Sequence, residues 1–445
     1  MILKKITIEN FRCFKNYEVD LTPGITVFIG KNGAGKTSLL NAIRYGLSVF
    51  FSNDSTMGDD LLISGNPDLK VISTLATDFY RAQNADLPAV DLTINMEAEF
   101  NDIPLNWEYY KRSTSGASLF VSKYQQAYRT LMAEYHNSDQ LPLFVFYSDS
   151  FPHIDTRTSD FAKKAIKEQG YIIRNFAYYK WNSEVSCTSI WQNRFINSML
   201  KQISLNDSDP LNSKEVEYIK NKLRTFSEPI NSALEEKDDF EIKDFFPVVD
   251  DKTLSLYLRL KNERDVIFDN LPAGYKRLYS IAFDLAYRLY ILRKTNEEDP
   301  KGIAIIDEID LHLHPSLEQE VLARLKKTFP SIQFIVSTHS PMVLSNLKVK
   351  DTGNMIYRMQ ADEETPNALP NLYGVDYSAA VYDFMGTPYA DNEVKEEIEA
   401  ILRLSRRGKP ELVEKRKEEL KSMVSEEQYI NIISKINSQL AEDKY

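Results

Sequence analysis

The sequence predicts an α/β protein with a mostly parallel core sheet, an antiparallel β subdomain, a helical insertion and a C-terminal helical tail. Two features of the sequence support this prediction. Short apolar runs, such as residues 302–306 and 332–336, alternate with stretches of helical periodicity, which is typical of parallel strands covered on both faces. Residues 91–122 instead alternate polar and apolar side chains, which is typical of antiparallel strands with one solvated face.

The composition excludes several classes of protein. The chain has 445 residues, and at roughly 150 residues per domain it allows about three structural units. A net charge of −11, from 54 Lys+Arg and 65 Asp+Glu, excludes a polybasic nucleic-acid coat but leaves a local basic patch open. Two cysteines argue against a disulfide framework or a cysteine zinc site. The sequence has no signal-peptide pattern and no long apolar run, so we expect a cytoplasmic protein that does not contact membranes.

The predicted elements follow one another from the N-terminus. Residues 2–8 and 17–21 alternate as strands, and residues 25–29 form an apolar strand that leads through a glycine-rich loop into a helix over 38–43. Residues 155–236 have helical periodicity. Because this stretch lacks a sustained heptad repeat, we do not expect it to form a long coiled-coil arm. The later elements are strands over 254–260, 302–306 and 332–336 and helices over 274–293, 316–328 and 392–440, with a break at 408–410 and a capping box of Ser425 and Gln428.

The glycine-rich loop fits the GxxxxGK[ST] phosphate-binding pattern and stands between a predicted strand and a predicted helix. Main-chain N–H groups of such a loop converge on phosphate oxygens, the lysine reaches the β- and γ-phosphates, and the last hydroxyl binds Mg²⁺. The pattern therefore predicts ATP and Mg²⁺ as cofactors; the alternative is an ordinary surface loop. The predicted nucleotide-binding residues are Gly30, Lys31, Asn32, Gly33, Ala34, Gly35, Lys36, Thr37 and Ser38.

Two carboxylates follow the apolar strand at 302–306. Ligands of open α/β sheets bind at the carboxyl ends of strands, so we expect Asp307 and Thr37 to hold Mg²⁺. Glu308 is then placed to polarise a water toward the γ-phosphate, with Lys36 as a second catalytic residue. The alternative is that the two acids only favour the start of a helix.

Three histidines lie shortly after this acidic pair. The spacing of His312 and His314 is a plausible one for zinc ligands. His339 instead follows the apolar strand at 332–336, where it would donate a hydrogen bond to the γ-phosphate or to the attacking water. We count His339 among the predicted catalytic residues.

Together these motifs resemble the ABC-type ATPase heads of the SMC/RecF/OLD branch, and within it the AAA15/AAA21-like ATPases. The resemblance is carried by residues 30–37, 305–308, 311–315 and 337–341. It implies a P-loop NTPase head in which Arg12, within the opening run 8–14, lies near the nucleotide. The alternative for Arg12 is a solvated turn arginine.

The family pattern also implies a signature loop, and residues 271–276 occupy its place. In this family the loop completes the site of the opposite subunit, so the resemblance implies that two heads enclose two ATP molecules. Pro272 stands where a phosphate-binding serine is usual, although the main chain of Ala273 and Gly274 at a helix start could still bind phosphate. We therefore expect slow ATP hydrolysis. Residues 147–149 occupy the place of the Q-loop without a glutamine.

Residues 163–201 interleave cations with aromatic side chains, a combination that suits nucleic acid but is also typical of a packed core or a protein interface. In the tail, Ile430, Ile433, Ile436 and Leu440 form an apolar stripe. It belongs either to an amphipathic helical hairpin that packs on the chain's own ATPase head or to a docking site for a partner subunit.

The resemblance divides the chain into four predicted regions. These are an N-terminal ATPase lobe over 1–150, a helical insertion or lid over 151–250, a C-terminal ATPase lobe over 251–360 that carries the signature loop, Walker B, D-loop and H-loop, and a helical tail over 361–445 that is a candidate for partner docking.

The tail, with the runs 372–376 and 383–388, is similar to Septu and retron-associated ATPases. This similarity implies a switch subunit that dimerises head to head, or forms a larger oligomer, and controls a separate nuclease or effector in antiphage defence. No Asp-x-Asp pair of a nuclease domain follows His339. The alternatives are a RecF-like DNA-binding ATPase in repair, with DNA as a direct partner, and an ATP-bound scaffold with negligible turnover.

Overall fold

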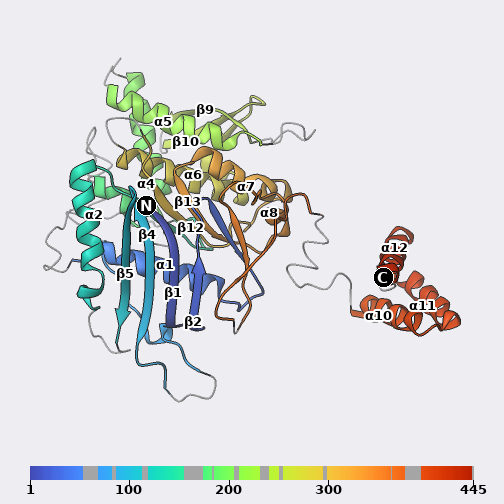
Figure 1. Ribbon diagram of the computed structural model, residues 1–445. Coiled ribbons are helices and arrows are strands. Elements are labelled where there is room, and N and C mark those ends of the chain that lie inside the picture. Colours follow the sequence, from blue (N-terminus) through green and yellow to red (C-terminus); the bar gives the residue numbers. More distant parts are fainter. Residues whose placement is uncertain are drawn as a thin grey trace. The chain divides into compact units, whose positions relative to one another are not determined.

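The protein forms two compact units, Met1–Gly374 and Val375–Tyr445, in the computed structural model (Figure 1). The structure describes residues 1–53, 69–82, 87–112, 119–154, 174–182, 185–204, 210–230, 240–249, 254–293, 298–361, 363–375 and 392–442. The finer division of the chain into four regions stays a prediction.

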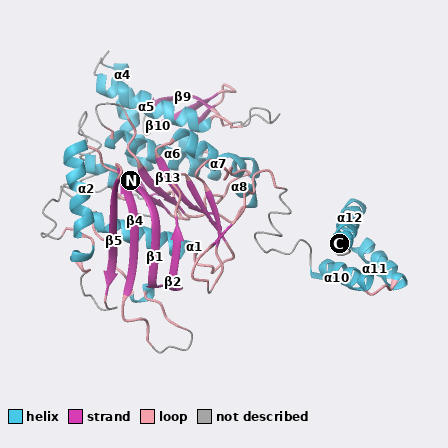
Figure 2. Cartoon of the chain, viewed as in Figure 1, coloured by secondary structure: helices cyan, strands magenta, loops and turns pink. Residues whose placement is uncertain are grey.

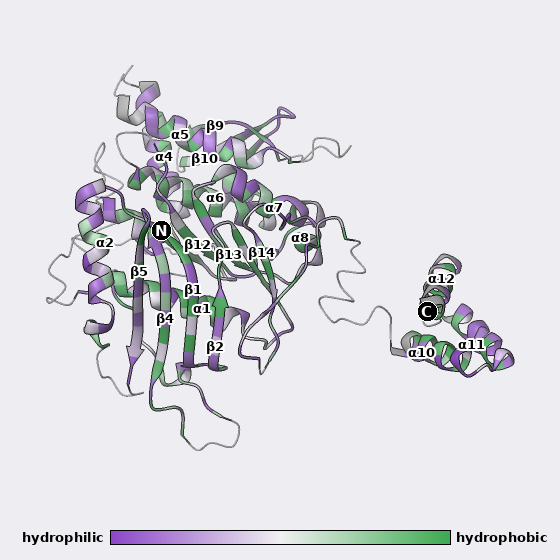
Figure 3. Cartoon of the chain, in the orientation of Figure 1, coloured by the Kyte–Doolittle hydropathy of each residue, from purple (hydrophilic) through white to green (hydrophobic). Residues whose placement is uncertain are grey.

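The core of the first unit is a mostly parallel sheet, as predicted. Its described strands run in the order β15-β14-β3-β13-β12-β6, in which all neighbours are parallel except β15 and β14. Residues of β3, β6, β12 and β13 are fully buried, and β12 and β13 are mainly apolar in Figure 3. The strands span Ile25–Ile29 (β3), Leu143–Tyr147 (β6), Gly302–Ile306 (β12), Ile332–Ser337 (β13), Met355–Arg358 (β14) and Asn367–Ala368 (β15).

A second, antiparallel sheet has the described order β2-β1-β4-β5 (Figure 2). Its strands are Phe14–Asp20 (β2), Ile2–Phe11 (β1), Leu92–Phe100 (β4) and Ile103–Lys111 (β5). They confirm the strands predicted over 2–8 and 17–21. The strands predicted over 91–122 are confirmed from 92 to 111, whereas residues 121–123 form a 3₁₀ helix. The two sheets are tied by the buried side chain of Gln333 on β13. Its amide accepts from the main-chain N–H of Leu3 at 2.8 Å and donates to the carbonyl of Leu3 at 2.7 Å.

Helix α1 (Lys36–Ser48) follows the glycine-rich loop and packs against β1 and β4 on one side and β13 on the other. The approach to β4 is close, because a Cβ at Gly46 would lie 2.0 Å from the sulfur of Met96. The indole N–H of Trp107 donates to the Gly46 carbonyl at 2.7 Å. The glycine therefore allows the helix to lie between the two sheets, and this position fixes the loop at its N-terminus.

The remaining part of the unit is helical with a small antiparallel sheet, β11-β10-β9. Strand β9 was not predicted; it is an edge strand of this sheet and so tolerates Pro247. Helix α2 lies in a stretch for which no helix was predicted. The bounds are Gln125–Ser138 (α2), Thr188–Ser204 (α4), Pro210–Ser227 (α5), Ala273–Leu292 (α6), Pro315–Thr328 (α7), Pro341–Ser345 (α8), His153–Ile154 (β7), Val185–Ser186 (β8), Ile242–Val249 (β9), Leu254–Leu260 (β10), Asp265–Ile267 (β11), and the short 3₁₀ helices Val49–Phe51 (η1), Ala76–Asp78 (η3), Val121–Lys123 (η4), Arg174–Tyr178 (η5) and Phe268–Asn270 (η6).

The second unit consists of α10 (Asn392–Arg406), α11 (Pro410–Met423) and α12 (Glu426–Glu442). The break at 408–410 is confirmed, and so is the capping box, in which Ser425 and Gln428 exchange side-chain and main-chain hydrogen bonds at 3.3 Å. Ile436 is buried in the core of this unit with Ile401 and Leu420. Ile430 is 62% exposed, so the predicted apolar stripe is wrong at that position.

No helix in the described part of the chain is both long enough and apolar enough to cross a membrane.

Candidate nucleotide site

The glycine-rich motif of residues 30–37 consists of a loop, residues 30–35, that connects β3 to α1, and of the first two residues of α1. Gly33 and Gly35 have φ angles of 84° and 95°, which favour glycine. A Cβ at Gly35 would lie 2.7 Å from the ring of Phe14 and 3.0 Å from the sulfur of Cys13, so the β1–β2 turn holds the loop closely. A Cβ at Gly33 would meet nothing within 4 Å, which shows that the apex of the loop is open.

Lys36 is the buried cation of this loop. Its ammonium donates to the main-chain carbonyls of Gly30 at 2.8 Å and Lys31 at 3.3 Å. Burial lowers the pKa of Lys36, while the carboxylates of Asp307, Glu308 and Asp310 act in the opposite direction. A desolvated cation beside an open glycine loop fits a polyphosphate. The side chains nearest the opening also fit, because Lys31, Asn32 and Thr37 are exposed and Ser38 is half-buried.

The acidic pair lies at the carboxyl end of β12, where the sequence placed it. Asp307 is 2% exposed, and its N–H donates to the carbonyl of Tyr147 at 2.8 Å. Ser337, at the end of β13, donates its hydroxyl to the Asp307 carboxylate and accepts from the N–H of Glu308 at 2.8 Å. The two strand ends are thus tied together. A hard-oxygen set of Asp307 and Thr37 fits Mg²⁺.

Glu308 has a left-handed backbone with a φ of 48°, unusual for a residue with a side chain. Burial raises the pKa of Glu308, and the neighbouring Asp307, Asp149 and Asp310 raise it further, while His339 lowers it. A carboxyl group with a raised pKa is a candidate for a proton-accepting role.

Asp310 connects Glu308 to His339 and was not among the predicted site residues. Its carboxylate accepts from the Thr338 hydroxyl at 2.6 Å and from the main-chain N–H of His339 at 3.2 Å. His339 is half-buried. His314 caps α7, where its ring accepts from the Ser316 N–H at 3.4 Å. Over the described ranges, no group of three or more metal-ligating side chains comes together, so the zinc alternative gains no support there.

Arg277 is a further residue that the sequence analysis missed. It lies on α6, is 2% exposed, and donates to four main-chain carbonyls. Two belong to the segment after β6, namely Asp149 at 2.8 Å and Phe151 at 2.7 Å, and two belong to Asp307 at 2.8 Å and Glu308 at 3.2 Å. In the sequence Arg277 follows Lys276 near the start of the predicted helix, where a second cation gives no signal of this role.

The predicted signature loop leads into α6, which begins at Ala273. A Cβ at Gly274 would lie 2.5 Å from the carbonyl of His312, so the start of α6 rests against the segment that follows Glu308 in the same chain. Ala273 is exposed and Gly274 is buried, and no side chain caps the start of the helix. Binding of a second subunit's nucleotide by Ala273 and Gly274 stays a prediction.

Arg12 lies in the β1–β2 turn beside the loop. Its guanidinium pairs with Asp78 at 2.9 Å, and the other carboxylate oxygen of Asp78 accepts from the hydroxyl of Tyr45 at 2.9 Å. In the single chain Arg12 therefore stabilises this turn. Its contact with a nucleotide stays a prediction.

The aromatic side chains proposed for base stacking lie in the core, and Arg194 forms a buried pair with Glu215 at 2.6 Å. Lys163, Lys164 and Lys167 lie outside the described residues. The described part of 163–201 therefore matches the packed-core alternative. The buried rings are those of Phe176, Tyr178, Tyr179, Trp181, Trp191 and Phe195.

Comparison with known proteins identifies the family. The model of the AAA ATPase domain matches residues 1–344. The chain belongs to this family. The predicted resemblance to AAA15-like ATPases is therefore confirmed.

The chain is also similar to ATPases of retron and Septu systems. The chain is 25% identical to the Retron Vc95 probable ATPase of Vibrio cholerae, over 82% of this chain and 76% of the relative. It is 28% identical to the Retron Ec83 probable ATPase of Escherichia coli, over 76% of this chain and 68% of the relative. It is 22% identical to the Septu protein PtuA of Bacillus mycoides, over the whole of this chain and 52% of that relative.

Among solved structures, the SMC head domain from Thermotoga maritima is similar, with 13% identity and a TM-score of 0.43. That match covers 83% of this chain and 99% of the SMC head.

Proposed function

We propose that the chain is a Mg²⁺-dependent ATPase that binds ATP at residues 30–38 and hydrolyses it with Glu308. One observation carries the proposal. Two motifs that are about 270 residues apart in the sequence meet at one place, since the carboxylates of Asp307, Glu308 and Asp310 act electrostatically on Lys36. The sheet produces this meeting, because β12, β13 and β3 are consecutive parallel neighbours.

Each residue of the site has a separate task. Main-chain N–H groups of the loop and Lys36 bind the phosphates, while Thr37 and Asp307 would hold Mg²⁺, which neutralises charge that develops on the phosphate oxygens. Glu308 accepts a hydrogen bond from the attacking water, and His339 donates to the γ-phosphate. Ser337, Asp310 and Arg277 fix the main chain around these groups, so that little reorganisation is needed on reaction.

We further propose that two heads associate around two ATP molecules, each head offering the start of α6 at Ala273 and Gly274 to the nucleotide of the other. The exposed Ala273 at a helix start without a side-chain cap supports this arrangement. Because Pro272 supplies no hydroxyl, turnover is slow. Loss of the γ-phosphate removes the bridge and loosens the heads, so that hydrolysis acts as a switch.

The partner we propose for this switch is a separate nuclease or effector in antiphage defence in the cytoplasm. Two observations support it: the similarity to retron ATPases and to the Septu protein PtuA over most of this chain, and a compact C-terminal unit after the ATPase domain.

A second candidate is a RecF-like DNA-binding ATPase. It is favoured by a match to RecF of Lactobacillus acidophilus at 44% identity over 62 residues, which is 14% of this chain. The buried aromatic side chains argue against stacking on bases. A DNA-binding titration at several salt concentrations separates the candidates, because phosphate contacts make affinity fall steeply with salt.

The direct test of the proposed function is Glu308→Gln. The amide cannot accept a proton, so we expect kcat for ATP hydrolysis to fall at least about 100-fold while ATP affinity is retained. Phosphate release and equilibrium binding of a fluorescent ATP analogue measure the two quantities. Glu364→Gln, an exposed carboxyl outside the site, is the matched control and should leave both unchanged. Unchanged hydrolysis by Glu308→Gln would show that another group activates the water.

A further inference from the structure

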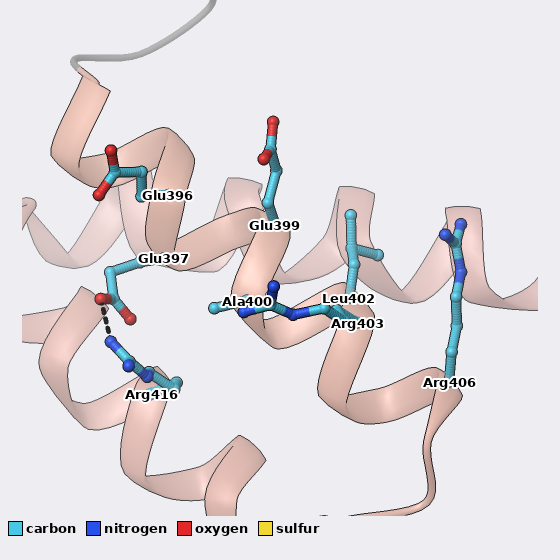
Figure 4. Close-up of a pocket in the computed structure, with 8 residues that line it drawn as sticks. All are labelled: Glu396, Glu397, Glu399, Ala400, Leu402, Arg403, Arg406 and Arg416. Atoms are coloured by element: carbon cyan, nitrogen blue, oxygen red, sulfur yellow. Dashed lines mark hydrogen bonds and ion pairs between the residues drawn. The ribbon is translucent and has the colours of Figure 1, made fainter.

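The exposed face of α10 has an unusual charge order. A groove of about 580 Å³ in the C-terminal unit is lined along this helix by Glu396, Glu399, Ala400, Leu402, Arg403 and Arg406 (Figure 4). The four charged side chains are all exposed. At 3.6 residues per turn they fall within an arc of roughly 80°, so they form one stripe that is acidic in its first half and basic in its second.

The stripe faces away from the core of its own unit. Ile401 of α10 is fully buried with Val413 and Leu420 of α11 and Ile436 of α12. Glu397, which is 8% exposed, pairs with Arg416 of α11 at 2.5 Å and helps hold the two helices together (Figure 4). The core and this pair fix the orientation of α10, so the charged face is presented as a fixed pattern.

The charges of the stripe are arranged symmetrically about position 401, with a glutamate on one side for each arginine on the other. Glu396 and Arg406 lie five residues on either side of Ile401, Glu399 and Arg403 lie two residues on either side, and Ala400 and Leu402 flank it. An antiparallel copy of the helix centred at the same position therefore puts every glutamate opposite an arginine. Glu396 and Arg406, the outer charges of the stripe, are separated along the axis of one helix by about 15 Å.

We propose that this face of α10 is an isologous interface that binds the antiparallel α10 of a second copy of this chain. If the partner were nucleic acid or a uniformly acidic peptide, the acidic half of the stripe would face like charges. A second copy related by a two-fold axis places an opposite charge against each charge of the stripe. Glu399 and Arg406 have other contacts within the single chain, which association exchanges for contacts with the copy. The interface goes beyond the ATP-dependent head dimer and needs no nucleotide.

Charge reversal with reconstitution tests the proposal on the full chain, without nucleotide and at about 50 mM salt. The double variant Glu396→Lys/Glu399→Lys makes the stripe entirely basic, and Arg403→Glu/Arg406→Glu makes it entirely acidic. Sedimentation equilibrium should show that each alone associates at least about tenfold more weakly than the parent chain, because every pair then repels. An equimolar mixture of the two should associate at least as strongly as the parent chain.

Two control variants carry the same charge changes on exposed residues that do not line the groove. Glu411→Lys/Glu418→Lys and Lys409→Glu/Lys415→Glu should leave the dissociation constant within about twofold of the parent value, because these side chains lie outside the stripe. A parent chain that stays monomeric at low salt, or a mixture that fails to regain association, would overturn the interface.

Disulfide trapping tests the direction of the helices even where a double variant folds poorly. Glu396→Cys mixed with Arg406→Cys should give a cross-linked dimer that neither variant gives alone. Cross-linking of Glu396→Cys with itself would require parallel helices, and its appearance would contradict the proposal. Because no nucleotide is present, the result is independent of whether the proposed ATPase function holds.

Discussion

Cys13 illustrates how a single residue next to the loop can report on its occupancy. A Cβ on Gly35 would come within 3.0 Å of its sulfur, and burial raises the pKa of its thiol although the residue as a whole is exposed. Only the thiolate reacts with an alkylating reagent. We therefore expect labelling of Cys13 by N-ethylmaleimide to be slow near neutral pH and to rise as the pH increases beyond the usual range of a thiol.

Saturating ATP should slow this labelling several-fold, because a filled loop restricts access to the β1–β2 turn. Mass spectrometry of the modified peptides measures the rate, and Cys187, which is 1% exposed, should stay unlabelled in the native protein and serves as the internal control. Equal labelling rates with and without ATP would show that the nucleotide does not occupy the loop near Gly35.

At the scale of elements, α6 is the helix that connects the predicted signature loop to the acidic pair. Arg277→Lys keeps the charge but cannot reach four carbonyl groups, and it leaves some of them buried without a donor. We expect the free energy of unfolding to fall by about 1–3 kcal/mol and kcat to fall about tenfold or more. We expect the KM for ATP to change little, because Arg277 contacts the main chain around Glu308 and not the glycine-rich loop.

Denaturant unfolding and steady-state kinetics give the two readouts for Arg277→Lys. Arg259→Lys is the matched control, since Arg259 is exposed and its contacts, an ion pair with Asp265 and a cation–π contact with Phe246, lie at the surface. It should change the free energy of unfolding by less than about 0.5 kcal/mol. Loss of stability without any change in kcat would assign Arg277 a purely structural role.

Elements with strong local patterns were predictable from the sequence. Strand β12, helix α6 and the break before Pro410 match within a residue or two, because apolar runs, glycine and proline act locally. Helix α2 was missed because Gln125–Ser138 mixes tyrosines with polar residues and ends at Asp139 with a φ of 54°, without glycine or proline. Strand β9 was missed because Pro247 argues against a strand unless it lies at a sheet edge.

The residues of the site also divide into those that a local sequence pattern predicts and those that it does not. Lys36, Asp307 and Glu308 stand out because their chemistry needs a fixed spacing along the chain. The tasks of Ser337, Asp310 and Arg277 depend on which strand ends and helix starts meet in the folded protein. No local pattern carries that information, because those contacts join residues about 30 to 130 positions apart.

For the whole molecule, the two proposals give two kinds of self-association that respond to different conditions. Association of heads requires ATP, whereas association through α10 requires low salt and opposite charges. With both available, the parent chain can form species larger than a dimer. The variant Arg403→Glu/Arg406→Glu removes the second contact, so that head association can be measured alone.

The most direct test of the central claim, that two chains enclose ATP, is therefore made on Glu308→Gln in the background of Arg403→Glu/Arg406→Glu. Light scattering coupled to size-exclusion chromatography gives its mass, and nucleotide extraction gives its ATP content. With ATP and Mg²⁺ we predict a dimer that holds two ATP molecules, and a monomer without nucleotide or when Lys36→Ala is added. A chain that stays monomeric with bound ATP, or that binds no ATP, would contradict the account.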